Sequence, residues 1–234
     1  MIRFHEVGFS YRAGEMILAH LDLEIAGGLT LLVGPNGCGK STVLKLAAGV
    51  EMPDAGRIEI DGHDLWKSEV EARRSLAYVP EHPDLAPYAT IEEIVALVCR
   101  LRREPPATVG HALDAAGIRP LAGHSVRELS LGQRRRAALA CALVGAPSHV
   151  LLDEPLEAMD RAAREDILAW IDGLLARDCT VVVVSHDIEP FLPRAARAFT
   201  VRDGRSLILD PLPSDPASRR RAVETMARPG PPLP

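Results

Sequence analysis

The run Gly34-Pro35-Asn36-Gly37-Cys38-Gly39-Lys40-Ser41-Thr42 stands between an apolar stretch, Leu29 to Val33, and a stretch of helical pattern, Thr42 to Ala48. It fits the pattern G-x-x-x-x-G-K-[ST], in which glycines let successive backbone N–H groups turn toward an anion. The helix that follows adds its free amides and positive dipole end at the same point. The sequence therefore predicts a phosphate loop that binds a nucleoside triphosphate.

Two side chains of this run have expected roles of their own. Lys40 is placed to reach the β- and γ-phosphates as a point charge, and the Ser41 hydroxyl is placed to ligate the Mg²⁺ that bridges them. All nine residues from Gly34 to Thr42 are predicted to contact the nucleotide. An ordinary glycine-rich turn is the alternative, and the strand before, the helix after and the complete motif disfavour it.

Length and composition limit the classes of protein that fit. The chain has 234 residues, of which 47% are hydrophobic, which suits one large α/β core with an inserted subdomain. A formal net charge of -5 argues against a broad electrostatic contact with nucleic acid, so none is expected as a partner. The four cysteines form no C-x-x-C pair, which indicates neither a disulfide framework nor a zinc site. With no long apolar run and no signal-like N-terminus, the protein is expected to be soluble by itself in a reducing cytosol.

The order of apolar runs predicts two kinds of sheet. Residues 1 to about 25 and Arg57 to Ile60 alternate as strands, which predicts an antiparallel patch on the N-terminal side, with a turn at Arg12 to Gly14. Val150 to Leu152, Val181 to Val184 and Phe199 to Val201 are continuously apolar and alternate with helical stretches such as Arg161 to Ala176. Such strands predict a mainly parallel sheet covered on both faces.

Helical periodicity replaces the strand pattern between about residues 83 and 145, which predicts an inserted helical subdomain. Residues 1–209 are expected to form one ATP-binding domain. Residues 210–234 are rich in proline and arginine, and predict a short extension with a helix around Arg219 to Met226 and a loose end. We assign no chemistry to that extension.

A second candidate site follows the strand Val150 to Leu152, where two carboxylates, Asp153 and Glu154, come in succession. Ligands bind at the carboxyl ends of strands in open α/β sheets. Asp153 is therefore predicted to ligate Mg²⁺ with Ser41, and Glu154 to accept a proton from an attacking water. The alternative is a strand that simply ends in solvated acids.

A second helix start lies at Leu129-Ser130-Leu131-Gly132-Gln133, before the helical stretch Arg134 to Val144. Ser130 is a suitable N-cap, and Gly132 permits a close approach to an anion. A capped helix start without a ligand is the commoner explanation of such a pattern.

The order of these motifs resembles the nucleotide-binding subunit of ABC transporters. It consists of the phosphate loop, Tyr78-Val79-Pro80-Glu81, Leu129 to Gln133, Val150 to Pro155 and Ser185-His186-Asp187, and the likeness covers about residues 1 to 205. The resemblance implies an α/β P-loop NTPase. It also implies that two subunits meet head to tail, with Ser130, Gly132 and Gln133 of one contacting the nucleotide held by the phosphate loop of the other.

The resemblance implies roles for three further positions. His186 matches a histidine that contacts the γ-phosphate and helps to hold Glu154 and the attacking water. Tyr11 falls where an aromatic ring stacks on adenine, although a core tyrosine would fit the sequence as well. Leu156 to Asp160 corresponds to a loop that crosses the dimer interface, and there Glu157 and Met159 depart from the usual serine and leucine.

Two departures bear on the nucleotide site. Leu131 replaces the first glycine of the usual Gly-Gly pair, which adds bulk beside the phosphate. Glu81 replaces a glutamine, which keeps an oxygen ligand for Mg²⁺ but loses the amide donor. A solvated loop acid is the alternative for Glu81. A glutamate here, with the loop Pro80 to Tyr88, is most similar to short single-domain subunits of ABC-2-type exporters and favours export.

The sequence thus predicts an ATPase that uses ATP and Mg²⁺, with Lys40, Glu154 and His186 as its catalytic residues. Its expected partners are a second ATP-binding subunit, most simply another copy, and integral-membrane permease subunits that dock around Glu81 to Tyr88 on the cytoplasmic face of the membrane. The run Arg134-Arg135-Arg136 is expected to be a solvated helix face. The competing hypothesis is a soluble ABC ATPase that assembles a cofactor or a complex.

Overall fold

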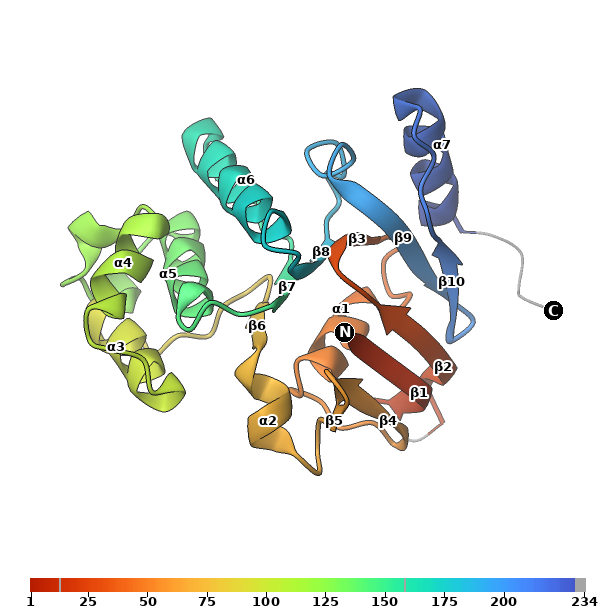
Figure 1. Cartoon of the computed structure of the whole chain (residues 1–234), viewed down its shortest axis with the longest axis horizontal. Coiled ribbons are helices and arrows are strands. Elements are labelled where there is room, and N and C mark those ends of the chain that lie inside the picture. Colours follow the sequence, from red (N-terminus) through yellow and green to blue (C-terminus); the bar gives the residue numbers. More distant parts are fainter. Residues whose placement is uncertain (13, 158, 230–234) are drawn as a thin grey trace.

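Two β-sheets and a separate group of helices make up the protein, which the computed structural model describes at residues 1–12, 14–157 and 159–229. Figure 1 shows the sheets at the centre and right of the molecule and the helical group at its left. Within the described residues, no helix has both the length and the apolar character needed to cross a membrane.

The larger sheet has six strands in the order β10-β9-β3-β8-β7-β6. These strands are β3 (Gly28–Leu32), β6 (Leu76–Val79), β7 (His149–Asp153), β8 (Thr180–Val184), β9 (Ala195–Arg202) and β10 (Arg205–Leu209). All neighbours are parallel except β9 and β10. Every residue of β7 and β8 is buried, as their continuously apolar sequences predict. The mainly parallel core sheet is confirmed, and β10 was not predicted.

The smaller sheet is antiparallel, in the order β2-β1-β4-β5. Its strands are β1 (Ile2–Ser10), β2 (Met16–Ile25), β4 (Ala55–Ile60) and β5 (His63–Asp64). It packs with α1 (Lys40–Ala47) against one face of the larger sheet, so that Phe4, Leu46 and Val182 share one core cluster. The N-terminal antiparallel patch is confirmed, while residue 13 of the expected turn lies outside the described residues.

Three helices cover the other face of the larger sheet: α5 (Leu131–Leu143), α6 (Arg161–Leu175) and α7 (Pro216–Ala227). Their buried side chains Leu139, Ile171 and Val223 belong to one core cluster with side chains of β7 and β8, and the helices contact β6, β8 and β9 respectively. The expected C-terminal helix is therefore present and longer than Arg219 to Met226, and the proline-rich end at 230–234 lies outside the described residues. The short α2 (Glu69–Arg74), beside β5, was not predicted.

The helical subdomain contains α3 (Ile91–Arg102), α4 (Thr108–Ala115), two 3₁₀ turns (Arg119–Leu121 and Val126–Glu128) and α5. Ile91, Val95 and Leu113 belong to its own core cluster. Thr90 caps α3, and its side chain and that of Glu93 bond reciprocally to each other's backbone N–H. The inserted helical subdomain is confirmed, and its first regular helix begins at Ile91.

The sheet topology gathers the predicted site residues at one edge. In the parallel register Leu32 and Asp153 both lie opposite Val184 of β8. The loops that leave the carboxyl ends of β3, β7 and β8 therefore start side by side, where ligands bind in such sheets.

Candidate functional site

The loop from Gly34 to Gly39 connects β3 to α1 and has the backbone of an anion cradle. Gly34, Gly37 and Gly39 have φ angles of +147°, +81° and +103°, which other residues rarely adopt. A Cβ added at Gly34 would lie 2.7 Å from Cys38 Sγ and 2.8 Å from Thr200 Oγ1. Glycine is thus required at Gly34 by both conformation and space.

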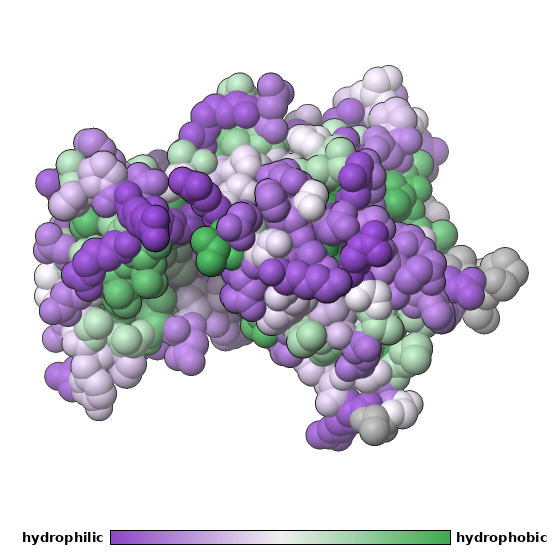
Figure 2. All heavy atoms as spheres, turned by 60° about the horizontal axis from the view of Figure 1, so that its bottom comes forward, coloured by the Kyte–Doolittle hydropathy of each residue, from purple (hydrophilic) through white to green (hydrophobic). Residues whose placement is uncertain are grey.

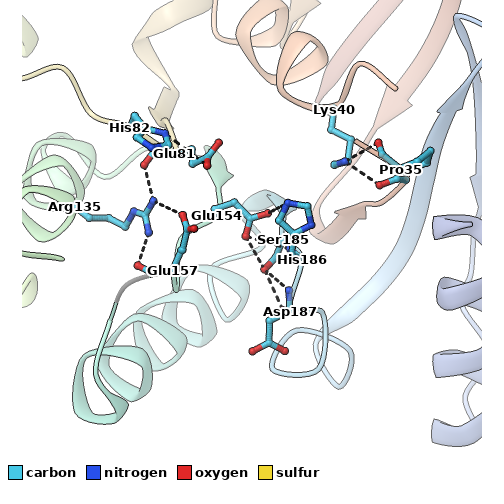
Figure 3. A network of polar contacts seen from close by, with 11 residues as sticks. Pro35, Lys40, Glu81, His82, Arg135, Glu154, Glu157, Ser185, His186 and Asp187 are labelled. Atoms are coloured by element: carbon cyan, nitrogen blue, oxygen red, sulfur yellow. Dashed lines mark hydrogen bonds and ion pairs between the residues drawn. The ribbon is translucent and has the colours of Figure 1, made fainter. Parts of the chain in front are cut away.

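The Lys40 ammonium folds back over this loop. Its Nζ donates to the carbonyl oxygens of Gly34 at 2.9 Å and Pro35 at 3.0 Å (Figure 3). Lys40 is the first residue of α1, so its charge lies at the helix end whose free amides attract anions. The Lys40 charge and the N-terminus of α1 therefore lie together, where an anion is favoured.

A cavity of about 450 Å³ lies beside the loop and brings together residues of five chain segments. Its polar and aromatic lining consists of Tyr11, Asn36, Lys40, Ser41, Thr42, Glu81, Asp153, Glu154 and His186, with Gly37 and Gly39. Most of the predicted first half-site is therefore assembled in one place. The cavity size suits a nucleotide-sized ligand.

Asp153 ends β7 and is buried beside Ser41. Burial raises the pKa of Asp153 above its ordinary value, and the charge of Glu81 raises it further, while a hydrogen bond with Ser41 and the charge of Lys40 oppose the rise. A hydroxyl and two carboxylates thus face the same cavity. Because Glu81 lines this cavity, it does not fit the alternative of a solvated acid without site contact.

Glu154 follows Asp153 with a positive φ of 50° and only 6% exposure. Its Oε2 accepts hydrogen bonds from Ser185 Oγ and from the His186 backbone N–H, both at 3.2 Å. Its Oε1 has no hydrogen-bond partner among the described residues, and His186 Nε2 lies 3.6 Å from it. Burial raises the pKa of this carboxyl, against the opposing effects of His186 and Ser185. Glu154 therefore presents one fixed and one free oxygen.

His186 lies beyond the end of β8, with its ring beside Glu154 (Figure 3). Its backbone N–H is held by Glu154 Oε2, and the next residue is held because Ser185 Oγ accepts from the Asp187 N–H at 3.2 Å. The side chain is 69% exposed, so the imidazole faces the cavity and solvent. The arrangement lets one ring contact both Glu154 and a ligand in the cavity.

Tyr11 presents a free ring at the rim of this cavity. It is 48% exposed and packs edge-on against Phe9, with the ring centroids 4.8 Å apart. Lys45 Nζ lies 5.8 Å from the centroid of the Tyr11 ring. The alternative of a core tyrosine does not fit this exposure, while an exposed ring face fits stacking on a base.

The residues of the predicted second half-site lie elsewhere. Ser130 caps α5, and its backbone N–H donates to Gln133 Oε1 at 2.8 Å, while Ser130 Oγ accepts from the Gln133 N–H at 3.3 Å. Ser130, Gly132 and Gln133 line a cavity of about 390 Å³ with Met159 and Asp160, and none of them lines the cavity of Lys40. The helix end is well formed, but within one chain it does not meet the phosphate loop.

Asp160 has a structural contact of its own in this second cavity. It caps α6, and its Oδ1 accepts from the Ala163 N–H at 2.8 Å. Residue 158, within the loop from Leu156 to Asp160, lies outside the described residues.

The expectation of a solvated face at Arg134-Arg135-Arg136 is wrong for Arg135. This side chain is 1% exposed and donates to the backbone carbonyl oxygens of Glu81 and Glu157. α5 is buried on more than one side, because it packs against β6 and against the other helices of its subdomain. A run of three arginines gives no signal of which one points inward.

The end of α7 was also missed as a neighbour of the site. Glu224 and Arg228 line a cavity of about 380 Å³ together with Gly34, Lys40 and His186. Arg220 pairs with Glu189, which connects α7 to the segment that follows His186. The sequence of the extension carries no motif that would have placed it there.

The described residues contain no group of three or more histidine, cysteine, aspartate or glutamate side chains arranged to hold a metal ion. The donor set beside the phosphate loop is of another kind, a hydroxyl from Ser41 and carboxylates from Asp153 and Glu81. Hard oxygen donors that are few in number suit Mg²⁺, which keeps several waters and binds phosphate oxygens as well.

Comparison with known proteins places the same segments in one family. A family model described as ABC transporter matches residues 18–157. The sulfate/thiosulfate import ATP-binding protein CysA of Mycolicibacterium paratuberculosis is 36% identical over 201 residues, which cover 83% of this chain and 55% of that protein. The spermidine/putrescine import ATP-binding protein PotA of Methylococcus capsulatus is 39% identical over 200 residues, which cover 83% of this chain and 52% of that protein. The chain spans about half the length of these two relatives.

Similarity to solved structures extends over nearly the whole chain. The dimeric ATP-binding cassette MJ0796, in a post-hydrolysis state bound to ADP and phosphate, superposes with a TM-score of 0.81 at 28% identity, over 90% of this chain and 98% of that one. A bacterial Atm1-family ABC exporter with ATP bound gives a TM-score of 0.74 at 28% identity, over 88% of this chain and 38% of the exporter chain.

Proposed function

Since this chain belongs to the ABC transporter family and is an ATPase of that family, we propose that two copies of it form the ATP-driven motor of a transporter. The observation that carries this proposal is the buried Glu154 carboxylate, which stands with Asp153 and Lys40 around one cavity of the phosphate loop. ATP is the substrate, and the paragraphs below assign its contacts to residues of this chain.

The phosphate loop binds the triphosphate and Tyr11 holds the base. Backbone N–H groups from Gly37 to Ser41 surround the β-phosphate, and Lys40 exchanges its two carbonyl contacts for phosphate oxygens. The exposed face of Tyr11 stacks on adenine. These contacts neutralise charge that grows on the phosphates during transfer.

Mg²⁺, when bound, would supply positive charge that stabilises the negative charge of the phosphates. Ser41 and Asp153 are the residues that hold it, because their oxygens are hydrogen-bonded to each other at the floor of the cavity. Glu81 adds a third oxygen from the neighbouring loop. Its carboxylate replaces the amide that is usual in the family, and it adds a negative charge near the phosphates.

Glu154 acts as the general base for water attack on the γ-phosphate. Its Oε2 is fixed by Ser185 and His186, which leaves Oε1 free to accept the proton. Burial shifts the pKa of Glu154 toward neutral pH, and a base whose pKa is nearer the working pH accepts a proton from water more efficiently. His186 lies close enough to orient both this carboxylate and the γ-phosphate.

A second copy completes each site. The N-terminus of α5, with Ser130 and Gly132, is an anion-binding helix end with its own cavity and no phosphate loop in reach within one chain. Head-to-tail pairing brings this helix end onto the nucleotide of the partner, which gives two sites by symmetry. The similarity to a dimeric cassette bound to ADP and phosphate supports this arrangement.

The helical subdomain offers a face for the membrane subunits. Leu97 and Leu101 of α3 and Tyr88 in the preceding loop are exposed large hydrophobic residues. Figure 2 shows hydrophobic side chains gathered over this part of the molecule, at its left. Exposed apolar patches with polar rims mark interaction sites, so we assign permease docking to this face. The motor is thereby held on the cytoplasmic side of a membrane.

The direction that similarity supports is import. The sequence features at Glu81 favoured export, but the relatives CysA and PotA, at 36% and 39% identity, are import ATP-binding proteins. Substrate recognition belongs to the membrane subunits.

Hydrolysis by the purified chain tests the enzymatic assignment. Wild-type protein with ATP and Mg²⁺ should release phosphate, whereas Glu154→Gln should bind ATP without turnover because an amide cannot accept the proton. Normal steady-state hydrolysis by Glu154→Gln would refute Glu154 as the base.

Purification of the tagged protein from detergent-solubilised membranes tests the transport assignment. An integral-membrane protein should co-purify, and a Leu97→Glu, Leu101→Glu double variant should lose it. Reproducible absence of any integral-membrane partner from the wild-type sample would favour a soluble assembly ATPase instead.

A further inference from the structure

The guanidinium of Arg135 lies buried between two loops that each contribute to the ATP site. Arg135 is on α5, three residues after Gly132. Its Nη1 donates to the Glu157 carbonyl oxygen, and its Nη2 donates to the Glu81 carbonyl oxygen at 2.5 Å. A third contact joins Nη2 to Glu157 Oε2 at 3.3 Å. Figure 3 shows this one side chain reaching both loops.

Both loops carry residues that act on the nucleotide. Glu81 faces the cavity that also holds Ser41 and Asp153. Glu157 belongs to the turn that follows the proposed base, and its N–H donates to the Glu154 carbonyl oxygen at 3.2 Å. The guanidinium holds the Glu81 backbone, while the Glu81 side chain lines the cavity with its Oε1 3.6 Å from His82 Nδ1.

Stability alone gives little reason for an arginine here. Taking a charge out of water is costly, and a buried ion pair is often no more stable than apolar residues of similar volume. The partner carboxylate of Glu157 is 53% exposed, which weakens the attraction, and Arg135 Nε has no hydrogen-bond partner among the described residues. What arginine supplies, and an apolar residue does not, is a planar fork that fixes two carbonyl groups relative to each other.

We propose that Arg135 is a positioning residue that couples the helix carrying Ser130 and Gly132 to the Glu81 and Glu154 loops. When the N-terminus of α5 binds the partner's nucleotide, α5 is held in one position. The Arg135 guanidinium then holds the backbones of both loops, which fixes the Glu81 carboxylate and the Glu154 base in the ATP site of the same chain. Each site is then fully ordered only when the other nucleotide is bound. This inference rests on the proposed function and adds a connection between its two half-sites.

The test compares Arg135→Gln and Arg135→Lys with the wild-type chain in two assays. The first measures binding of a fluorescent ATP analogue in EDTA and across a Mg²⁺ titration, and the second measures kcat and KM for ATP. In EDTA the Arg135→Gln variant should bind as the wild type does, because the phosphate loop is untouched. Its Mg²⁺ requirement should rise and its kcat fall by about 10- to 100-fold, the usual effect of losing a group that orients a metal or its ligands. KM should change little.

Arg135→Lys should recover part of kcat and of the Mg²⁺ response. A lysine keeps the charge, but its single ammonium group lacks the two parallel N–H donors of a guanidinium. It can therefore hold one carbonyl oxygen firmly and the other weakly. A role in general stability would instead lower the folded fraction and leave the Mg²⁺ requirement of the folded protein unchanged.

Arg102 provides a matched control on the same chain. Its Nη1 donates to Val144 O at 2.9 Å and its Nη2 to Leu76 O at 2.8 Å, so it also bridges the helical subdomain and the sheet. Among the described residues, its hydrogen bonds reach no loop of the ATP site. Arg102→Gln should lower the melting temperature and leave kcat and the Mg²⁺ titration as in the wild type.

Wild-type kcat and Mg²⁺ titration in Arg135→Gln would overturn the inference, as would equal changes in Arg102→Gln. If Arg135→Gln does not fold, Arg135→Lys decides by the same criteria. Absence of hydrolysis by the wild-type chain would refute the proposed function, and the Mg²⁺-dependent binding of the Arg135 variants would still decide this inference.

Discussion

Replacing the buried base by its neutral isostere, Glu154→Gln, should stabilise the nucleotide-free protein at neutral pH. The wild-type carboxylate is 6% exposed, and its Oε1 has no hydrogen-bond partner among the described residues. An unpaired buried polar atom costs about 1–3 kcal/mol, and more when it is charged, so the neutral amide carries a smaller cost although it also stays unpaired. Against this, the hydrogen bonds from Ser185 and His186 lose the strength that a charged acceptor gives, about 0.5–1.5 kcal/mol in all.

The net gain expected from these two effects is about 1 kcal/mol, which raises the melting temperature by about 2–4 °C for a chain of this length. The gain must depend on pH with a definite sign. Burial raises the native pKa of Glu154 above its ordinary value of 4.5, so the native state binds this proton more tightly than the unfolded chain does. Wild-type stability therefore falls as pH rises from the ordinary value through the raised native pKa, and the Gln variant lacks this loss.

The assay is differential scanning fluorimetry of both proteins without nucleotide, in buffers from about pH 5 to about pH 8. Other titrating groups are present in both proteins, so the difference between the two melting temperatures reports Glu154 and its interaction with Asp153. The difference should be largest at the alkaline end and shrink as pH falls. A variant that melts below the wild type at about pH 8, or a difference that is the same at every pH, would refute the argument from burial.

Three further substitutions test separate parts of the site. Gly34→Ala should abolish ATP binding in a fluorescence titration, because its Cβ would lie 2.7 Å from Cys38 Sγ and 2.8 Å from Thr200 Oγ1; retained affinity would contradict the assigned loop geometry. Ser130→Ala should cost about 1 kcal/mol of stability through loss of the α5 cap, measured by urea unfolding, and an unchanged midpoint would show that the cap adds nothing. Glu81→Gln should retain hydrolysis but shift its Mg²⁺ dependence or its stimulation by the membrane partner. If both are unchanged, Glu81 does not face the metal.

The fold could be predicted where sequence patterns are local and repeated. The apolar runs at Val150 to Leu152 and Val181 to Val184 fit only buried parallel strands, and the structure has them as β7 and β8. The edge strand β10, Arg205–Leu209, was not predicted because none of its residues is fully buried, so its sequence lacks a continuous apolar run. It forms a strand because it pairs with β9.

The phosphate loop, Asp153 and Glu154 follow from motifs at strand and helix ends, whereas Tyr11, Glu81 and His186 were expected only from the resemblance to ABC transporter subunits. Arg135 could not be predicted, since its role depends on which way one member of an arginine run points after α5 has packed on β6. The proximity of α7 to Lys40 is equally hidden, because it arises from long-range packing of Val223 and not from any motif.

The composite site is the central claim, and a mixing experiment tests it most directly. Lys40→Ala removes the phosphate-loop charge. Gly132→Asp places a carboxylate at the start of α5, which suits the helix but repels a phosphate. Each variant alone should be inactive. When the two are mixed, half of randomly formed dimers pair one of each, and each mixed dimer holds one intact site. Up to about a quarter of the wild-type hydrolysis rate should therefore return, and less to the extent that the intact site depends on a nucleotide in the other. A mixture no more active than its separate components would contradict a site shared between two chains.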